Sequence, residues 1–183
     1  MKEDLSEIIK VPDEVKVEVV DTTVHVSKAK EAVSRTFVIP RVKIVLNNKE
    51  IVLSAKKATK REKKLLYSTR AHIQNMILGV QQPYVYVLKV CSGHFPITVS
   101  LANGILSVKN FLGEKIARTT RILTSTVVNV EGSSITVTSA DKEAAGRVAS
   151  NIELMMKISK RDRRVFQDGI FITQKPKWSY DEQ

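Results

Sequence analysis

Apolar and polar residues alternate along the first third of the chain, and this alternation predicts short strands. Valine alternates with charged residues over residues 15–19, and Val24 and Val26 repeat the alternation after Asp21-Thr22, which is the period-two pattern of half-buried strands. Two apolar runs follow at residues 42–46 and 50–53. Between them lie Asn47 and Asn48, a residue type that tolerates the positive φ of a tight hairpin. These patterns predict a small antiparallel sheet.

A helical pattern follows this sheet. Thr59 and Glu62 have the spacing of a capping box, in which both side chains bond to free amide groups at the helix start. Six residues at three- and four-residue spacing then share one face: Leu65, Leu66, Thr69, Ile73, Met76 and Ile77. Gly79 stands where a left-handed cap would end the helix. The spacing therefore predicts a helix from about residue 59 to residue 79.

Basic residues crowd the start of this predicted helix. They are Lys56, Lys57, Lys60, Arg61, Lys63 and Lys64. Because the N-terminal end of a helix dipole is positive, each cation placed there costs a few tenths of a kcal/mol. Local helix stability does not explain why cations are placed there, whereas the binding of an anion would.

The same order of elements begins again after Pro83. Five further strand patterns follow, at residues 84–90, 97–101, 105–108, 127–130 and 135–138. Asn103-Gly104 is a strong hairpin signal, and residues 139–141 resemble a helix N-cap. The second helical face comprises Ala144, Ala145, Val148, Ala149, Ile152 and Met156. The sequence therefore predicts an α+β protein of two tandem duplicated domains, residues 1–83 and 84–183, each a small, mostly antiparallel sheet packed with one main helix.

The charge of the sequence indicates what kind of molecule the protein binds. The 183 residues carry a formal net charge of +11, and 43% of them are hydrophobic, which is enough for a core and excludes a wholly disordered basic tail. Residues 1–25 carry three basic and seven acidic side chains, whereas residues 26–80 carry 13 basic and three acidic ones. Such a positive field attracts a polyanion, most commonly nucleic acid. A merely soluble basic surface is the alternative, and the acidic first 25 residues are expected to face a protein.

The sequence also bears on where the protein works. No apolar run approaches the ~20 residues of a membrane span. Residues 1–7 have neither the apolar core of a secretory signal nor the arginines of an import signal. The single Cys91 excludes an intramolecular disulfide and fits a reducing compartment. We expect a cytosolic or nuclear globular protein.

Patterns typical of catalysis are missing from the sequence. His25, His72 and His94 lack metal-ligand spacing, and there is no nucleophile elbow, Walker loop or glycine-rich dinucleotide fingerprint. Cys91 ends an apolar strand pattern and is expected to be a buried thiol. The sequence therefore predicts no enzymatic activity, no metal site and no cofactor.

Three basic clusters remain as candidate RNA contacts. They comprise Lys115, Arg118 and Arg121; Lys160, Arg161, Arg163 and Arg164; and Lys175 and Lys177 with Trp178 and Tyr180. Guanidinium forks match phosphate geometry, and an exposed Trp or Tyr beside them can stack on a base. Phe166 and Phe171 are expected to pack in the core, whereas Trp178 is expected to be exposed. A solvated charged face is the alternative for the arginines.

Four ordered motifs resemble a known family. The stretch Arg161-x-x-Arg164-x-Phe166-x-Asp168-Gly169-Ile170-Phe171-Ile172-x-x-Lys175 resembles the C-terminal motif of the universal large-subunit ribosomal protein six family, in its eukaryotic and archaeal form. Residues 72–79, 94–97 and 110–115 agree with it, so the resemblance covers essentially the whole chain. One departure is Leu154, where the family usually has Gln.

The resemblance implies a structural constituent of the large ribosomal subunit, made of two duplicated domains. It implies contacts with rRNA near the sarcin–ricin loop and the factor-binding region, and neighbouring ribosomal proteins that include the stalk base, with no membrane or small-molecule substrate. Carried over by motif position, phosphate contacts are expected from Lys160, Arg161, Arg163, Arg164, Lys175 and Lys177, and in second place from Lys115, Arg118 and His94. The implied location is the cytoplasmic ribosome, with the nucleolus during assembly in a eukaryote.

Two other functions remain open at this point. A non-ribosomal RNA-binding assembly factor or regulator is the first, although no aromatic RNP motif or Gly-x-x-Gly loop supports it. An RNA-modifying enzyme is the second, and it would need a cofactor or metal site that the sequence lacks.

Overall fold

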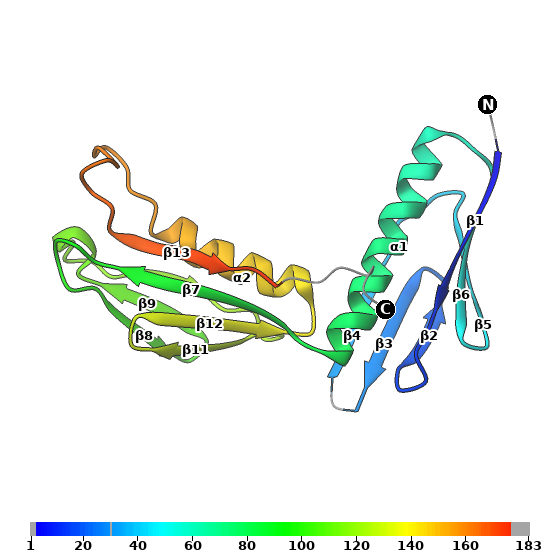
Figure 1. The fold of residues 1–183 in the computed structure, drawn as a ribbon, viewed down its shortest axis with the longest axis horizontal. Coiled ribbons are helices and arrows are strands. Elements are labelled where there is room, and N and C mark those ends of the chain that lie inside the picture. Colours follow the sequence, from blue (N-terminus) through cyan, green and yellow to red (C-terminus); the bar gives the residue numbers. More distant parts are fainter. Residues whose placement is uncertain (1–2, 30, 177–183) are drawn as a thin grey trace. The chain divides into compact units, whose positions relative to one another are not determined.

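The computed structural model describes residues 3–29 and 31–176, and the chain divides into two compact units, residues 1–83 and 84–183. Each unit combines small antiparallel sheets with one helix, so the predicted α+β class is confirmed. Figure 1 shows the elements of both units.

Two three-stranded sheets and a long helix form the first unit. Its elements are β1 (Glu3–Lys10), β2 (Lys16–Val20), β3 (Thr23–Lys28), β4 (Glu31–Thr36), β5 (Lys43–Asn47), β6 (Glu50–Ala58) and α1 (Lys60–Gln81). The sheets have the strand orders β1-β6-β5 and β2-β3-β4, and all their pairings are antiparallel. The buried face of α1, which includes Leu66 and Ile73, shares one core with Ile51 and Leu53 of β6 and Val24 of β3.

Two sheets and a shorter helix form the second unit. Its elements are β7 (Tyr84–Cys91), β8 (Thr98–Ala102), β9 (Ile105–Lys109), a 3₁₀ turn (Phe111–Gly113), β10 (Arg118–Arg121), β11 (Val127–Glu131), β12 (Ser134–Ser139), α2 (Lys142–Met155) and β13 (Gly169–Gln174). The strand orders are β10-β9-β8 and β11-β12-β7-β13. Val148 and Ile152 of α2 pack with Leu88 of β7, Ile135 of β12 and Leu106 of β9.

The two units correspond element by element. The β1-β6-β5 sheet matches β7-β12-β11, the meander β2-β3-β4 matches β8-β9-β10, and a helix follows in each case. Among the strands of residues 3–29 and 31–176, β13 has no counterpart, and it pairs with β7 at an edge that corresponds to an edge of β1. Among the described residues, no strand pairs with that edge of β1. The second unit therefore has one strand more than the first, and the pairing of this strand with β7 fixes the position of the residues just before it.

Helix starts follow the sequence signals closely, but one helix end does not. Thr59 caps α1 in a complete capping box, and the Asp141 side chain caps α2 by accepting from the Glu143 amide. The prediction that Gly79 forms a left-handed cap is wrong, because Gly79 is buried within α1 and the helix continues to Gln81. Gln82 takes an extended backbone instead, as a residue before proline prefers, so Pro83 rather than the glycine ends the helix.

The uneven charge of the sequence is partly balanced inside the first unit. Glu7 of β1 accepts a hydrogen bond of 2.9 Å from Arg70 of α1. Asp13 pairs with Lys49, and Glu14 pairs with Lys28. Each pair joins the acidic first 25 residues to the basic segment that follows. Several acidic side chains of the N-terminal segment are thus used within the unit.

We predict that Thr59→Ala lowers the free energy of unfolding by about 1 kcal/mol, because the first turn of α1 loses its side-chain acceptor. Urea denaturation followed by circular dichroism measures the change. Ser68→Ala, at an exposed position on the same helix, is the matched control and should alter stability by only a few tenths of a kcal/mol. Equal effects of the two substitutions would contradict the role of the cap.

Candidate nucleic-acid interface

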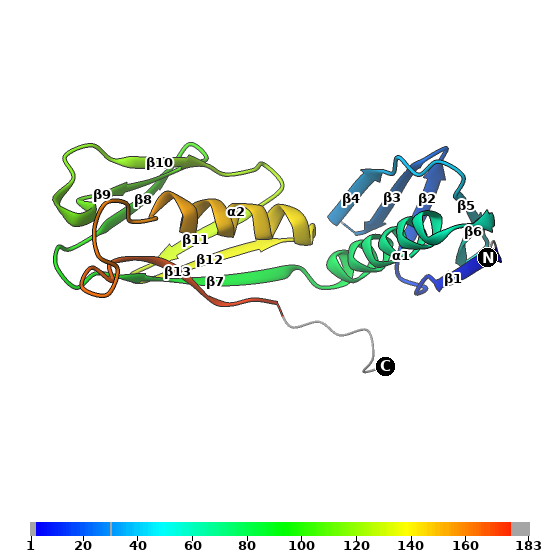
Figure 2. The same cartoon turned by 90° about the horizontal axis from the view of Figure 1, so that it is seen from above.

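A basic loop connects α2 to β13. We use this name for residues 157–168, which Figure 2 shows leaving the end of α2 and returning along the sheet into β13. Four of the predicted contact residues lie on this loop, and all four are exposed: Lys160, Arg161, Arg163 and Arg164. The structure thus brings one of the three predicted basic clusters together on a single surface segment.

Asp162 organises the middle of the basic loop through short-range hydrogen bonds. Its carboxylate accepts from the Arg164 amide at 2.9 Å, and its carbonyl accepts from the Phe166 amide at 3.0 Å. Asp and Asn commonly fold turns in this way. The Asp162 carboxylate is thus used by a backbone amide of the loop itself. The side chains of Lys160, Arg163 and Arg164 have no ion-pair partner within the part of the chain that the structure describes.

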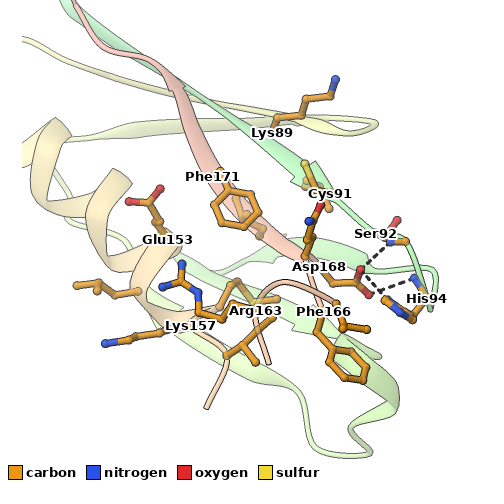
Figure 3. Close-up of a pocket in the computed structure, with 18 residues that line it drawn as sticks. Lys89, Cys91, Ser92, His94, Glu153, Lys157, Arg163, Phe166, Asp168 and Phe171 are labelled. Carbon is orange, nitrogen blue, oxygen red and sulfur yellow. Dashed lines mark hydrogen bonds and ion pairs between the residues drawn. The ribbon is translucent and has the colours of Figure 1, made fainter. Parts of the chain in front are cut away.

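The buried carboxylate of Asp168 fixes the end of the basic loop. It accepts from the Gly93 amide at 2.7 Å and from the His94 amide at 3.2 Å, and the His94 Nδ1 lies 3.2 Å from it (Figure 3). Because a carboxylate only accepts, this contact assigns the proton to Nδ1. Burial by itself raises the pKa of Asp168, but the hydrogen bonds from Gly93 and His94 outweigh it, and the pKa lies below its usual value.

Ring contacts add to this anchor. The rings of His94 and Phe166 stack with centroids 5.0 Å apart, and the Arg161 guanidinium lies 4.9 Å from the Phe166 centroid. Phe166 is half-buried and packs against the core of the second unit, close to its predicted role. His94, a predicted RNA contact, therefore also positions the loop.

Arg118 has internal partners for most of its donors. Its Nε and Nη2 atoms form a fork on the Glu114 carboxylate at 2.8 and 2.5 Å, and its guanidinium lies 4.4 Å from the centre of the Phe111 ring. Its Nη1 donates to the carbonyls of Met155 and Lys157 at 2.7 and 3.3 Å. Arg118 thus binds the last carbonyls of α2, from which the basic loop departs.

The remaining predicted contacts are dispersed. Lys115 is exposed between the 3₁₀ turn and β10, and Lys175 is exposed directly after β13. Lys177 and Trp178 lie outside the described residues. Phe171 departs from its prediction, because this supposed core residue is 38% exposed. Among the described residues no strand pairs with the outer side of β13, so a side chain of this edge strand can remain accessible.

A pocket of about 1110 Å³ lies beside the basic loop. Its walls come from the ends of β7 and α2, from the loop and from β13, and Figure 3 shows the side chains that line it. Lys157, Arg163 and Phe171 line it together with Asp168 and His94. The pocket therefore connects the anchored end of the loop with its cations.

Two chemical properties of the described residues complete the picture. No group of three or more His, Cys, Asp or Glu side chains is arranged to hold a metal ion in residues 3–29 and 31–176. Over the same residues, no helix combines the length and the apolar character that crossing a membrane requires.

The duplicated α+β fold and its exposed basic loop define a class of small, basic, two-domain proteins, and comparison with known sequences identifies the family. A family model described as ribosomal protein L6 matches residues 95–169. A large ribosomal subunit protein uL6 from Nanoarchaeum equitans is 43% identical over 90% of this chain and 90% of its own length. Its namesake from Methanobrevibacter smithii is 37% identical over 93% of this chain and 96% of its own length. The namesake from Methanococcus vannielii is 35% identical, with coverage of 93% and 94%.

The chain belongs to the uL6 family of large ribosomal subunit proteins. The resemblance seen in the sequence is thereby confirmed, and the chain is not an enzyme. These three relatives are archaeal, so they support the archaeal side of the expected form and not a eukaryotic source.

Sequence reasoning missed the anchoring roles of Asp168 and Glu114. Glu114 and Arg118 have the four-residue spacing of a local ion pair, which the sequence does display. The partners of Asp168 lie more than 70 residues away, and no periodic pattern connects them. Only the pairing of β13 with β7 brings Gly169 opposite Cys91 and so places Asp168 beside Gly93.

We predict that Asp168→Asn lowers the stability of the second unit by about 1–3 kcal/mol at neutral pH, because buried donors lose a charged acceptor. The native pKa is depressed, so this contribution is present above the unfolded value of about 3.8 and is lost as the pH falls through the native one. The free energy of unfolding, measured from about pH 2 to about pH 7, should therefore fall less steeply with acid in the variant than in the wild type. An unchanged slope would contradict the assignment.

We predict that Arg118→Ala lowers the free energy of unfolding by about 1.5–3 kcal/mol, because it removes charge-assisted hydrogen bonds to Glu114 and to the end of α2. Arg118→Lys should recover only part of the loss, since an ammonium cannot form the fork. Arg121→Ala, exposed on the same strand, is the matched control. Amide hydrogen exchange should report the opening at residues 155–158.

Proposed function

We propose that this protein is a structural constituent of the large ribosomal subunit whose basic loop binds rRNA. The observation that carries the proposal is the loop itself. Lys160, Arg163 and Arg164 are exposed and have no acidic partner in the described chain, on a segment held by Asp168 at one end and Arg118 at the other. Relatives that cover most of the chain are named as proteins of the large ribosomal subunit.

The mechanism is the presentation of cations by a rigid scaffold. A-form RNA has a deep and narrow major groove that side chains cannot read, so recognition is by shape and through phosphates. Guanidinium groups held on an anchored loop lose little conformational freedom when they bind, and this favours a fixed docking geometry. Lys175 extends the basic surface beyond β13, and we include Lys115, Lys177 and Trp178 as further contacts.

Arg118 and His94 enter this proposal in a different role. Most Arg118 donors are engaged within the second unit, and His94 is held by Asp168 and Phe166. We assign them to positioning the basic loop, with any direct RNA contact limited to the atoms that remain exposed.

The finer placement follows the family resemblance. We propose contacts with rRNA beside the sarcin–ricin loop and the factor-binding region, with neighbouring ribosomal proteins that include the stalk base. The protein then acts in cytoplasmic ribosomes, and passage through a nucleolus applies only in a eukaryotic source. The exposed acidic residues at the start of β1, Glu3 and Asp4, are the part we assign to a protein neighbour rather than to RNA.

We predict that Arg163→Glu with Arg164→Glu excludes the protein from large subunits, because two phosphate contacts become repulsive. Tagged wild type and variant are co-expressed, and their ratio in sucrose-gradient fractions of large subunits and polysomes is measured by mass spectrometry. The control is Lys109→Glu with Arg147→Glu, two exposed cations of the same unit, outside the candidate clusters, with the same change of charge.

The control variant should enter subunits as the wild type does. Equal exclusion of both variants would mean that net charge rather than the basic loop is recognised. Wild-type protein that stays in the light fractions would overturn the ribosomal assignment and favour a free RNA-binding factor.

A further inference from the structure

The pocket beside the basic loop combines an apolar surface with free cations. Its floor includes Met156 and Ile170, which are almost fully buried, and its rim includes Leu154 and Val165, which are 62% and 61% exposed. Its volume of about 1110 Å³ is ample for one small planar ligand. Exposed apolar side chains that gather at a pocket often mark a binding site.

The Phe171 ring occupies a fixed place in this pocket. It lies over Gly169, where an added Cβ would stand only 3.0 Å from the ring, so the glycine makes room for the ring beside the strand. Lys89 is the directly paired residue across β7. Phe171 therefore presents an exposed aromatic surface whose position is set by the backbone of β13.

Two cationic side chains, Lys157 and Arg163, also line this pocket. In Figure 3 the Arg163 side chain lies below the Phe171 ring, and the Lys157 side chain lies farther out and extends away from the ring. Across the described residues, neither side chain has a hydrogen bond or an ion pair, and the nearby Glu153 carboxylate accepts from the Ile172 amide at 3.0 Å. Both acids of the pocket, Glu153 and Asp168, thus accept from backbone amides, whereas the Lys157 and Arg163 side chains have no acidic partner in the described chain.

These features match the parts of one nucleotide. An aromatic surface stacks a base, and cations beside it hold the flanking phosphates. A base inside a duplex is already stacked on its neighbours, so only a base turned out of the helix can enter a pocket between a helix end and an edge strand.

We propose that this pocket takes a single unstacked base of RNA, which stacks on Phe171 while its flanking phosphate lies on Lys157 and Arg163. The inference rests on the proposed function, because it names which feature of the RNA the second unit selects. Leu154 sits on the rim, so this chain offers the base an apolar edge.

The test separates stacking from charge by the salt dependence of binding. Affinity for protein-free rRNA from large subunits of the source organism is measured over a series of salt concentrations. Phe171→Ala should weaken binding roughly 5- to 150-fold, the range for one lost base stack, with the slope of log affinity against log salt unchanged. Phe171→Trp, which keeps a ring, should retain most of the affinity.

Two further variants make the comparison specific. Phe95→Ala removes another exposed phenylalanine of the same unit that does not line the pocket, and it should leave affinity unchanged. Lys160→Gln with Arg164→Gln should weaken binding and lower the salt slope by about two, because two phosphate contacts are lost. Thermal melting checks that each variant is folded.

The outcomes distinguish the two proposals. If Phe171→Ala binds as tightly as the wild type, or lowers the salt slope, the base pocket is overturned while the basic loop stands. If Lys160→Gln with Arg164→Gln has no effect, the RNA-binding loop itself fails. In isolated large subunits, ultraviolet cross-linking should join one nucleotide to the peptide that contains Phe171. An unmodified peptide there would overturn the pocket whatever the free rRNA shows.

Discussion

The buried carboxylate of Asp168 is the contact on which the geometry of the basic loop depends. The chain leaves α2, carries five exposed cations and must return to an edge strand at a fixed register. Asp168 sits at that point of return and accepts hydrogen bonds from the loop that follows β7. Because the donors are backbone amides, these bonds tie the Asp168 side chain to the main chain at Gly93 and His94, and the Phe166–His94 stack then has a defined place. An exposed loop of this length would otherwise sample many conformations, which would raise the entropic cost of binding.

Arginine has two distinct roles in the second unit, and burial separates them. Arg118 is three-quarters buried and binds Glu114 and the last carbonyls of α2, so its charge is used to close the helix end. Arg163 and Arg164 are exposed, and neither side chain has an ion-pair partner in the described chain. The same residue type therefore supports the scaffold in one place and supplies free charge in another. The distinction arises from position in the fold, since all three occur in clusters that look alike in the sequence.

A comparison of the two repeated units explains how the second unit holds its basic loop. Both units bury one helix face against small antiparallel sheets, which is sufficient for a core in each. Strand β13 is the addition, and it uses a sheet edge whose counterpart on β1 has no partner in the described chain. Adding a strand at an edge leaves the existing core intact and brings in the segment before it. A basic loop could thus be joined to a stable unit without rebuilding that unit.

The sequence by itself determined the α+β class, most of the strands and both helix starts, because period, hairpin residues and caps are local signals. It also located the arginines of the basic loop, since clustered charge is visible in one dimension. Strands β1, β4, β10 and β13 were not predicted because their sequences lack a clear period-two alternation, and the end of α1 depended on Pro83 rather than Gly79. Tertiary structure alone decided that Arg118 is internal, that Asp168 anchors the loop and that Phe171 is exposed. Each of those outcomes depends on contacts between residues far apart in the chain, or on which strand lies at the edge of a sheet, and neither leaves a periodic trace in the sequence.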